Sequence, residues 1–206
     1  MTREELDIWV LASRFRKAID AAKQAGEFKN DIAFKLFPTR CCGDTCYLLA
    51  EFLLEHGIYT EYVEGQKGKQ SHAWLVLSDE QILTNKRDRL AKERNCIRNQ
   101  DETVLFSYQA VIDAINDGTI FNHIYVKPDY RKEIGERLVI DITGDQFSKK
   151  KRYLNYDIPV YVGKMDELHD LFEILNVHEC NGLRDIATMN VNRMEYLYNE
   201  IKRYIE

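Results

Sequence analysis

The sequence contains few of the residues that interrupt regular structure, and it lacks a long apolar run. Its 206 residues include three prolines and ten glycines, whereas 45% of them are hydrophobic. This composition excludes a disordered or collagen-like chain and predicts a folded core. No segment approaches the roughly 20 consecutive apolar residues that a membrane-spanning helix needs. The first residues, MTREELDIWV, contain acids and no such run, so we expect neither a membrane anchor nor a signal peptide.

Basic residues are outnumbered by acidic ones, 29 to 34, so the formal net charge is −5. An acidic chain disfavours dedicated binding to nucleic acid. Two basic runs, 86–98 and Lys149–Arg152, are the candidate contacts for a phosphate backbone. We expect the first to be an exposed helix face, because acids interrupt it, and the second to lie in a loop. The sequence therefore predicts that neither nucleic acid nor a membrane is a partner.

The cysteines do not suggest a disulfide framework. There are five of them, at positions 41, 42, 46, 96 and 180, and two are adjacent in sequence. An odd number of cysteines without a paired spacing is typical of free thiols in a reducing compartment. We therefore expect a cytoplasmic location.

Hydrophobic periodicity predicts an α+β protein whose sheet is antiparallel. Helical patterns cover 4–24, the segment from Cys42 to Gly57, 86–98, 108–117, 165–176 and 183–204. Strand patterns cover 58–63, 73–77, 138–142 and 158–162. The length fits a single domain over 1–206, with a helical insertion at 79–136 and a C-terminal helical extension at 164–206. The terminal helices are also a candidate contact between copies of the chain.

Three residues form a candidate nucleophile, base and orienting group. Cys42 lies where the second helix should begin, and the positive end of the helix dipole favours thiolate over thiol there. His72 begins a strand and is suited to accept the thiol proton and later protonate a leaving amine. Asp141 is a carboxylate inside an apolar strand, where an unpaired charge would be costly, so it should have a partner. Cysteine, histidine and aspartate in this order predict a catalytic triad.

The same segments resemble a known family. CGDTCYLLAEFLLEHGIYTEYVEGQ, which starts at Cys42, is similar to the core of transglutaminase-like proteins, with a cysteine that opens a helix and a following Gly57-Ile58. His72-Ala73-Trp74 and Asp141-Ile142-Thr143 resemble the family's His-Ala-Trp and Asp-x-Thr motifs. The resemblance covers about a quarter of the chain and implies a papain-like fold whose nucleophile helix packs on an antiparallel sheet. It implies the roles of nucleophile for Cys42, base for His72 and orienting residue for Asp141.

This reading predicts a thiol enzyme that cleaves or modifies an amide bond in a protein or peptide substrate, without a metal or cofactor. Water as the acceptor gives a cysteine peptidase or a glutamine deamidase, and an amine gives a transglutaminase. The separation between His72 and Asp141 is longer than in the family. The insertion at 79–136 accounts for that length and is a candidate lid or substrate-recognition element.

Several alternatives stay open at this stage. A papain-like register would make Cys46 the nucleophile, and Asp145 rivals Asp141 as the third member. Asp141 also has an alternative partner in Arg137. A zinc site could use Cys42, Cys46 and His72, with Asp141 or Cys41 as the fourth ligand. The backbone N–H of Cys42 is a first oxyanion donor, and the candidates for the second donor are Gln66, Gln146 and Trp74. A catalytically silent binding module of the same fold is the remaining alternative.

Overall fold

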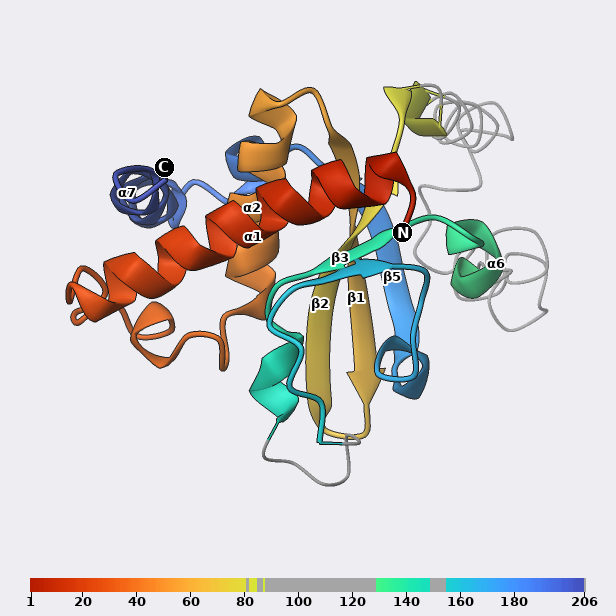
Figure 1. Ribbon diagram of the computed structural model, residues 1–206, viewed down its shortest axis with the longest axis horizontal. Helices are drawn as coiled ribbons and strands as arrows, with labels where there is room; N and C mark the ends of the chain where they lie inside the picture. The colour runs from red at the N-terminus through yellow and green to blue at the C-terminus, as the bar shows by residue number, and fades with distance from the viewer. Residues whose placement is uncertain (81, 85–86, 88–128, 149–154, 206) are drawn as a thin grey trace, which may run out of the picture. The chain divides into compact units, whose positions relative to one another are not determined.

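Figure 1 shows the computed structural model, which describes residues 1–80, 82–84, 87, 129–148 and 155–205. Contacts between residues divide the chain into two units, Met1–Asp79 with Ile134–Glu206, and Glu80–Glu133. Apart from residue 87, the helices predicted at 86–98 and 108–117 fall outside the described residues, as does the basic run Lys149–Arg152. The single domain with an insertion at 79–136 therefore stays a prediction.

The first unit is built on a five-stranded antiparallel sheet in the order β4-β3-β2-β1-β5. Its strands are β1 (Tyr59–Lys67), β2 (Gln70–Ser78), β3 (Val139–Asp141), β4 (Tyr161–Gly163) and β5 (Glu173–Cys180). The short helix α6 (Tyr130–Ile134) precedes β3 in the chain. The predicted α+β class with an antiparallel sheet is confirmed.

The two central strands form a hairpin that fixes the position of His72. Strand β1 ends at Lys67 and β2 begins at Gln70, which leaves the two-residue turn Gly68-Lys69. Gly68 has a φ of 59°, a left-handed conformation that a tight hairpin turn requires and that glycine adopts without strain. The resulting register pairs Gly65 with His72.

Helices α1 (Arg3–Gln24) and α2 (Cys42–Glu55) pack against this sheet, and α7 (Val191–Lys202) packs against α1 and α2 (Figure 1). Helix α1 begins with a capping box, in which Thr2 and Glu5 bond each other's backbone N–H groups. Helix α2 contacts β1 and β2, whereas α1 contacts α2, α7 and β4. Buried side chains on one face of α2 pack into the shared core: Leu48, Leu49, Phe52 and Leu53.

The C-terminal region departs from the sequence prediction. The helix predicted at 165–176 is wrong, because this region contains the 3-10 turn η4 (His169–Leu171) and the edge strand β5. Strand β5 pairs with β1, so the predicted extension at 164–206 contributes a strand to the sheet and is not purely helical. The helix predicted over 183–204 is also too long: η5 (Gly182–Asp185) precedes α7, which begins at Val191.

Apolar spacing explains the error at 165–176. Leu168, Leu171, Phe172 and Leu175 follow a helical repeat, and that repeat suggested a helix. In the structure Ile174, Val177 and Cys180 are the buried residues of β5, and a bulge between Glu64 and Gly65 of β1 shifts the register. Pairing with a strand more than 100 residues earlier decides the conformation, and local periodicity does not report such pairing.

Among the described residues, no helix combines the length and apolar character needed to cross a membrane.

Candidate active site

Cys42 is the first residue of α2, as the sequence predicted. Cys41 occupies the N-cap position without a side-chain cap, and its carbonyl accepts the first helical hydrogen bond from Thr45 N–H at 2.8 Å. The helix therefore begins with backbone N–H groups that its own turn does not satisfy. Cys42 is half-buried, whereas Cys41, Cys46 and Cys180 are buried. Cys42 is thus the most exposed residue of the four described cysteines.

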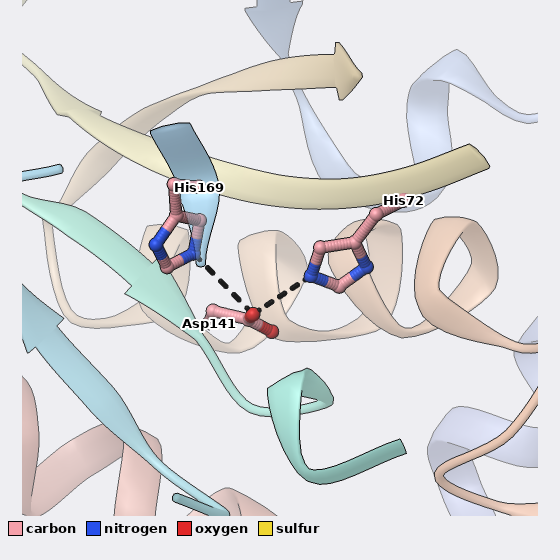
Figure 2. Close-up of side chains that lie close together, drawn as sticks. All are labelled: His72, Asp141 and His169. Carbon is pink, nitrogen blue, oxygen red and sulfur yellow. Dashed lines mark hydrogen bonds and ion pairs between the residues drawn. The ribbon is translucent and has the colours of Figure 1, made fainter. Parts of the chain in front are cut away.

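The structure brings His72 and Asp141 into contact (Figure 2). His72 Nε2 lies 2.8 Å from Asp141 Oδ2, and both side chains are buried. The imidazole has aromatic neighbours on several sides, with ring centroids at 5.5 Å for Trp74, 5.1 Å for Phe147 and 5.5 Å for Phe172. These apolar rings exclude water and strengthen the interaction between His72 and Asp141.

A tight turn after β3 orients the Asp141 carboxylate. Its Oδ1 accepts hydrogen bonds from Thr143 N–H at 2.8 Å and from Thr143 Oγ1 at 3.1 Å, which leaves Oδ2 for His72. At Gly144 a side chain has no room, because a Cβ would lie 2.8 Å from Tyr156 and 3.0 Å from Asp141 Oδ2. The Asp-x-Thr motif therefore presents one carboxylate oxygen to the histidine.

Cys42 completes this arrangement through an interaction with His72. Burial alone would raise the pKa of Cys42, but a hydrogen bond and the charge of His72, with a further hydrogen bond from Ala73 N–H, lower it below the ordinary value. Because Nε2 of His72 faces Asp141, Nδ1 is the nitrogen left for the sulfur. The other described cysteines differ. Burial raises the pKa of Cys41 and of Cys180 to about 12, and raises that of Cys46 well above its ordinary value.

The charge on His72 follows from the same contacts. Burial lowers the pKa of His72, yet the Asp141 charge and hydrogen bond and the Cys42 sulfur outweigh it and raise the pKa to about 10. Asp141 shows the complementary shift: burial raises its pKa, but the charges and hydrogen bonds of His72 and of a second histidine, His169, outweigh burial and lower the pKa below its ordinary value. The arrangement favours a thiolate, an imidazolium and a carboxylate together near neutral pH.

Gln146 is the candidate oxyanion donor whose side-chain amide contacts His72. Its Nε2 is 3.2 Å from His72 Nδ1, on the side of the ring that faces Cys42. Gln66 lies in the exposed hairpin and donates to Gly68 O at 2.8 Å, and the Trp74 ring is fully buried. Gln146 belongs to η2 (Gly144–Phe147), so the turn that orients Asp141 also places this amide.

The rival partners of the triad have other contacts. Asp145 binds Arg16 through two hydrogen bonds of 2.9 and 2.8 Å, and Arg137 pairs with the buried Glu61. Both charges are therefore engaged away from the His72–Asp141 contact. The roles of Cys42, His72 and Asp141 stay predictions, and the geometry places the three residues together.

Sequence reasoning missed one member of the site, His169 on η4. Its Nε2 lies 3.4 Å from Asp141 Oδ2, and its Nδ1 lies 2.6 Å from Asp166 Oδ1 (Figure 2 shows the contact with Asp141). The spacing Asp166-x-x-His169 was the available signal, since an aspartate can cap the turn that carries a histidine three residues later. The mistaken helix at 165–176 hid that signal.

The metal hypothesis selected a different set of residues from the one that the structure assembles. Among the described residues, the group whose side chains could hold a metal ion together is His72, Asp141 and His169, with ligand atoms within 4.8 Å of one another. Cys46 is buried and its raised pKa disfavours the thiolate that a zinc ligand requires.

Comparison with known proteins adds no assignment: no family model matches the chain, and no match was found among curated proteins or solved structures.

Proposed function

We propose that this protein is a thiol-dependent acyl-transfer enzyme that acts on an amide bond, with Cys42 as nucleophile, His72 as base and Asp141 as the orienting residue. The observation that carries the proposal is the convergence of the three groups. Cys42 interacts with one side of His72, and the other side lies 2.8 Å from the Asp141 carboxylate. The resemblance to transglutaminase-like proteins, with a papain-like fold, belongs to the same proposal.

The chemistry follows from the proton positions. The Cys42 thiolate attacks the amide carbon, and the carbonyl oxygen takes the negative charge as a tetrahedral intermediate forms. Backbone N–H groups at the start of α2 and the Gln146 amide stabilise that oxyanion. His72 Nδ1–H then protonates the amine as the carbon–nitrogen bond breaks, which leaves a thioester on Cys42. Water, deprotonated by His72, attacks the thioester carbon; the acid product leaves, and the Cys42 thiolate and the His72 imidazolium are restored.

The acceptor in the second half decides between hydrolysis and amine transfer. Water gives a cysteine peptidase or a glutamine deamidase, which we favour, and a primary amine gives transglutaminase activity. Both paths form the same thioester on Cys42, so one test of Cys42 as the nucleophile applies to both. A binding module with the same fold would lack the reactive thiolate.

The first prediction concerns the pH dependence of iodoacetamide labelling, read for each cysteine by peptide mass spectrometry. Because His72 lowers the pKa of Cys42, we expect rapid labelling of Cys42 well below the ordinary thiol pKa of about 8.5. Cys41, Cys46 and Cys180 should label slowly, because burial raises their pKa and restricts access.

Two variants make this measurement decisive. His72→Ala should move the Cys42 profile to higher pH, because the sulfur loses its counterion. Cys46→Ala should leave the profile unchanged, since Cys46 is buried beside the site. Fast labelling of Cys46 would instead support the papain-like register, and ordinary pH dependence at all cysteines would support the silent binding module.

The second prediction separates Gln146 from the nucleophile. With p-nitrophenyl acetate as an acyl donor, Gln146→Leu should slow acetylation of Cys42 by about 100-fold, as loss of one oxyanion donor does elsewhere. Iodoacetamide labelling should slow far less, because alkylation forms no oxyanion and is affected only through the contact of Gln146 with His72. The matched control is Gln66→Leu in the hairpin, which should change neither rate. Equal slowing of both reactions by Gln146→Leu would contradict the assigned role.

A further inference from the structure

The Asp141 carboxylate contacts two buried histidines, and the proposed mechanism uses only one of them. His169 Nε2 lies 3.4 Å from the same Oδ2 atom that binds His72 (Figure 2). The two histidine rings come from separate elements, β2 and η4, and both are completely buried. A buried histidine aimed at the orienting carboxylate needs a defined proton arrangement.

Asp166 determines where one proton of His169 lies. Its Oδ1 is 2.6 Å from His169 Nδ1 and also accepts from the backbone N–H groups of Leu168 at 3.0 Å and His169 at 3.2 Å. Its Oδ2 accepts from the Tyr156 hydroxyl at 2.8 Å. A carboxylate in this arrangement is an acceptor only, so Nδ1 of His169 carries a hydrogen and donates it.

The contact of the second nitrogen, Nε2, with Asp141 is unfavourable if the ring is neutral. A neutral imidazole with hydrogen on Nδ1 has a lone pair on Nε2, and this lone pair would point at the Asp141 carboxylate. Nε2 is buried and has no regular hydrogen-bond partner in the described structure. The contact with Asp141 becomes attractive when Nε2 also carries a hydrogen, that is, when His169 is an imidazolium.

We propose that His169 is a constitutive imidazolium that positions Asp141, as the second member of a chain of contacts from Asp166 through His169 and Asp141 to His72. The inference rests on the proposed function of Cys42 and adds a positioning residue to the same site. His169 binds Asp141 Oδ2 on one side, while Thr143 binds Oδ1. The carboxylate is thereby held in one orientation and kept ionised for His72.

The charges that face His169 agree with this assignment. Asp141 on β3 and Asp166 before η4 are the two acids, and His72 on β2 is the cation, with ring centroids 6.3 Å apart. Tyr161 on β4 adds an aromatic ring at 5.5 Å, and Trp74 on β2 adds one at 5.0 Å. Burial lowers the pKa of His169, but hydrogen bonds and charges from both acids outweigh it and raise the pKa.

A metal ion is the competing occupant of this cluster, since the same three side chains have ligand atoms within 4.8 Å. Three features favour a second proton on His169 over a metal ion. Only three donor groups converge among the described residues, whereas a structural zinc site takes four. All three side chains are nearly inaccessible to the water that would complete the shell. The Asp166–His169 hydrogen bond and the Asp141 contact are both satisfied by a single added proton.

The experiment observes the histidine ring nitrogens directly, by NMR of the full chain labelled with ¹⁵N-histidine, from about pH 5 to about pH 8. His169 signals are assigned by their loss in His169→Gln. We expect both nitrogens of His169 to stay protonated across this range. A His169 with an unprotonated Nε2 near neutral pH would overturn the proposal, as would stoichiometric bound metal that disappears in His169→Gln.

A second readout links the imidazolium to the nucleophile. His169→Gln keeps an N–H donor without the charge, and His169→Phe keeps a ring without the donor or the charge. Without the charge, Asp141 binds a proton at higher pH and His72 loses its partner. We therefore expect both variants to raise the pH midpoint of Cys42 labelling by about one unit. At a pH below the midpoint, this shift lowers the labelling rate about tenfold. His56→Gln, at the exposed end of α2, is the matched control and should leave the profile unchanged.

The two hypotheses fail in different ways. If wild-type Cys42 labels with the pH dependence of an ordinary thiol, the proposed function fails whatever the state of His169. If Cys42 labels early and both position-169 variants keep the wild-type profile, the proposed function stands and the positioning role is overturned. A profile shifted in His169→Phe but not in His169→Gln would also overturn it, because a hydrogen bond would then be sufficient.

Discussion

Replacing Asp141 with asparagine is expected to slow acetylation of Cys42 by p-nitrophenyl acetate by roughly a thousandfold or more, by analogy with loss of the triad carboxylate charge in serine enzymes. The reason is electrostatic. His72 is completely buried, and burial alone lowers its pKa. Without the Asp141 charge the imidazolium is no longer favoured, and the Cys42 thiolate loses its counterion. The pH midpoint of Cys42 labelling should rise to the free thiol pKa of about 8.5 or above it.

Asp145→Asn is the matched control for this variant. Asp145 lies four residues later in the same turn, but it binds Arg16 at 2.8 Å and is not part of the His72 contact. Its substitution should lower thermal stability without shifting the Cys42 profile. Unfolding of Asp141→Asn would be visible as fast labelling of the buried Cys41, Cys46 and Cys180. A folded Asp141→Asn protein with a wild-type profile would show that His72 does not depend on this carboxylate.

The same pair also determines how stability varies with pH. The pKa of Asp141 is lowered in the folded protein, so its contribution to stability is present above about pH 4 and is lost as the pH falls. The pKa of His72 is raised to about 10, so its contribution is complete below its ordinary value of 6.5 and is lost as the pH rises toward 10. Thermal melting of wild type should show both limbs, and Asp141→Asn should flatten them.

Local signals in the sequence were sufficient for the parts of the site that lie on regular elements. A cysteine at a helix start, a histidine on a strand and an acid in an apolar strand are each visible within a few residues. The structure places Cys42 at the start of α2, His72 in β2 and Asp141 at the end of β3. The spacing of these elements did not determine their contacts, but the cost of burying an unpaired Asp141 predicted that it has a partner.

The rest of the site depends on contacts between distant segments. His169 reaches Asp141 because β5 joins the sheet beside β1 and η4 immediately precedes it. A local helical repeat concealed that pairing. Gln146 could be proposed as a donor from its residue type alone, but its selection over Gln66 required the position of η2 beside His72. Which charges neutralise each other inside a core is a property of the packed structure.

Arg16 illustrates how remote residues support the site, and its loss should produce a large decrease in stability. Its side chain is 9% exposed and lies on α1, yet it contacts the turn that follows β3. It donates to Ile142 O at 2.7 Å, to Pro159 O at 3.0 Å and to both oxygens of Asp145. Its guanidinium also lies 4.7 Å from the centroid of the Phe37 ring. One cation therefore holds α1, the Asp141 turn and the segment before β4 together.

Arg16→Met should reduce the free energy of unfolding by about 3 kcal/mol, because the half-buried Asp145 carboxylate and two carbonyls lose their donor. For a chain of this length, that loss corresponds to a decrease of roughly 10 °C in melting temperature. Arg16→Lys should lie between the two proteins, since an ammonium cannot form the paired bonds to Asp145. The control is Asp20→Asn, which removes the 43% exposed partner of Arg16 and should cost less than about 1 kcal/mol. If Arg16→Met melts within a degree or two of wild type, Arg16 does not have the structural role that its contacts assign to it.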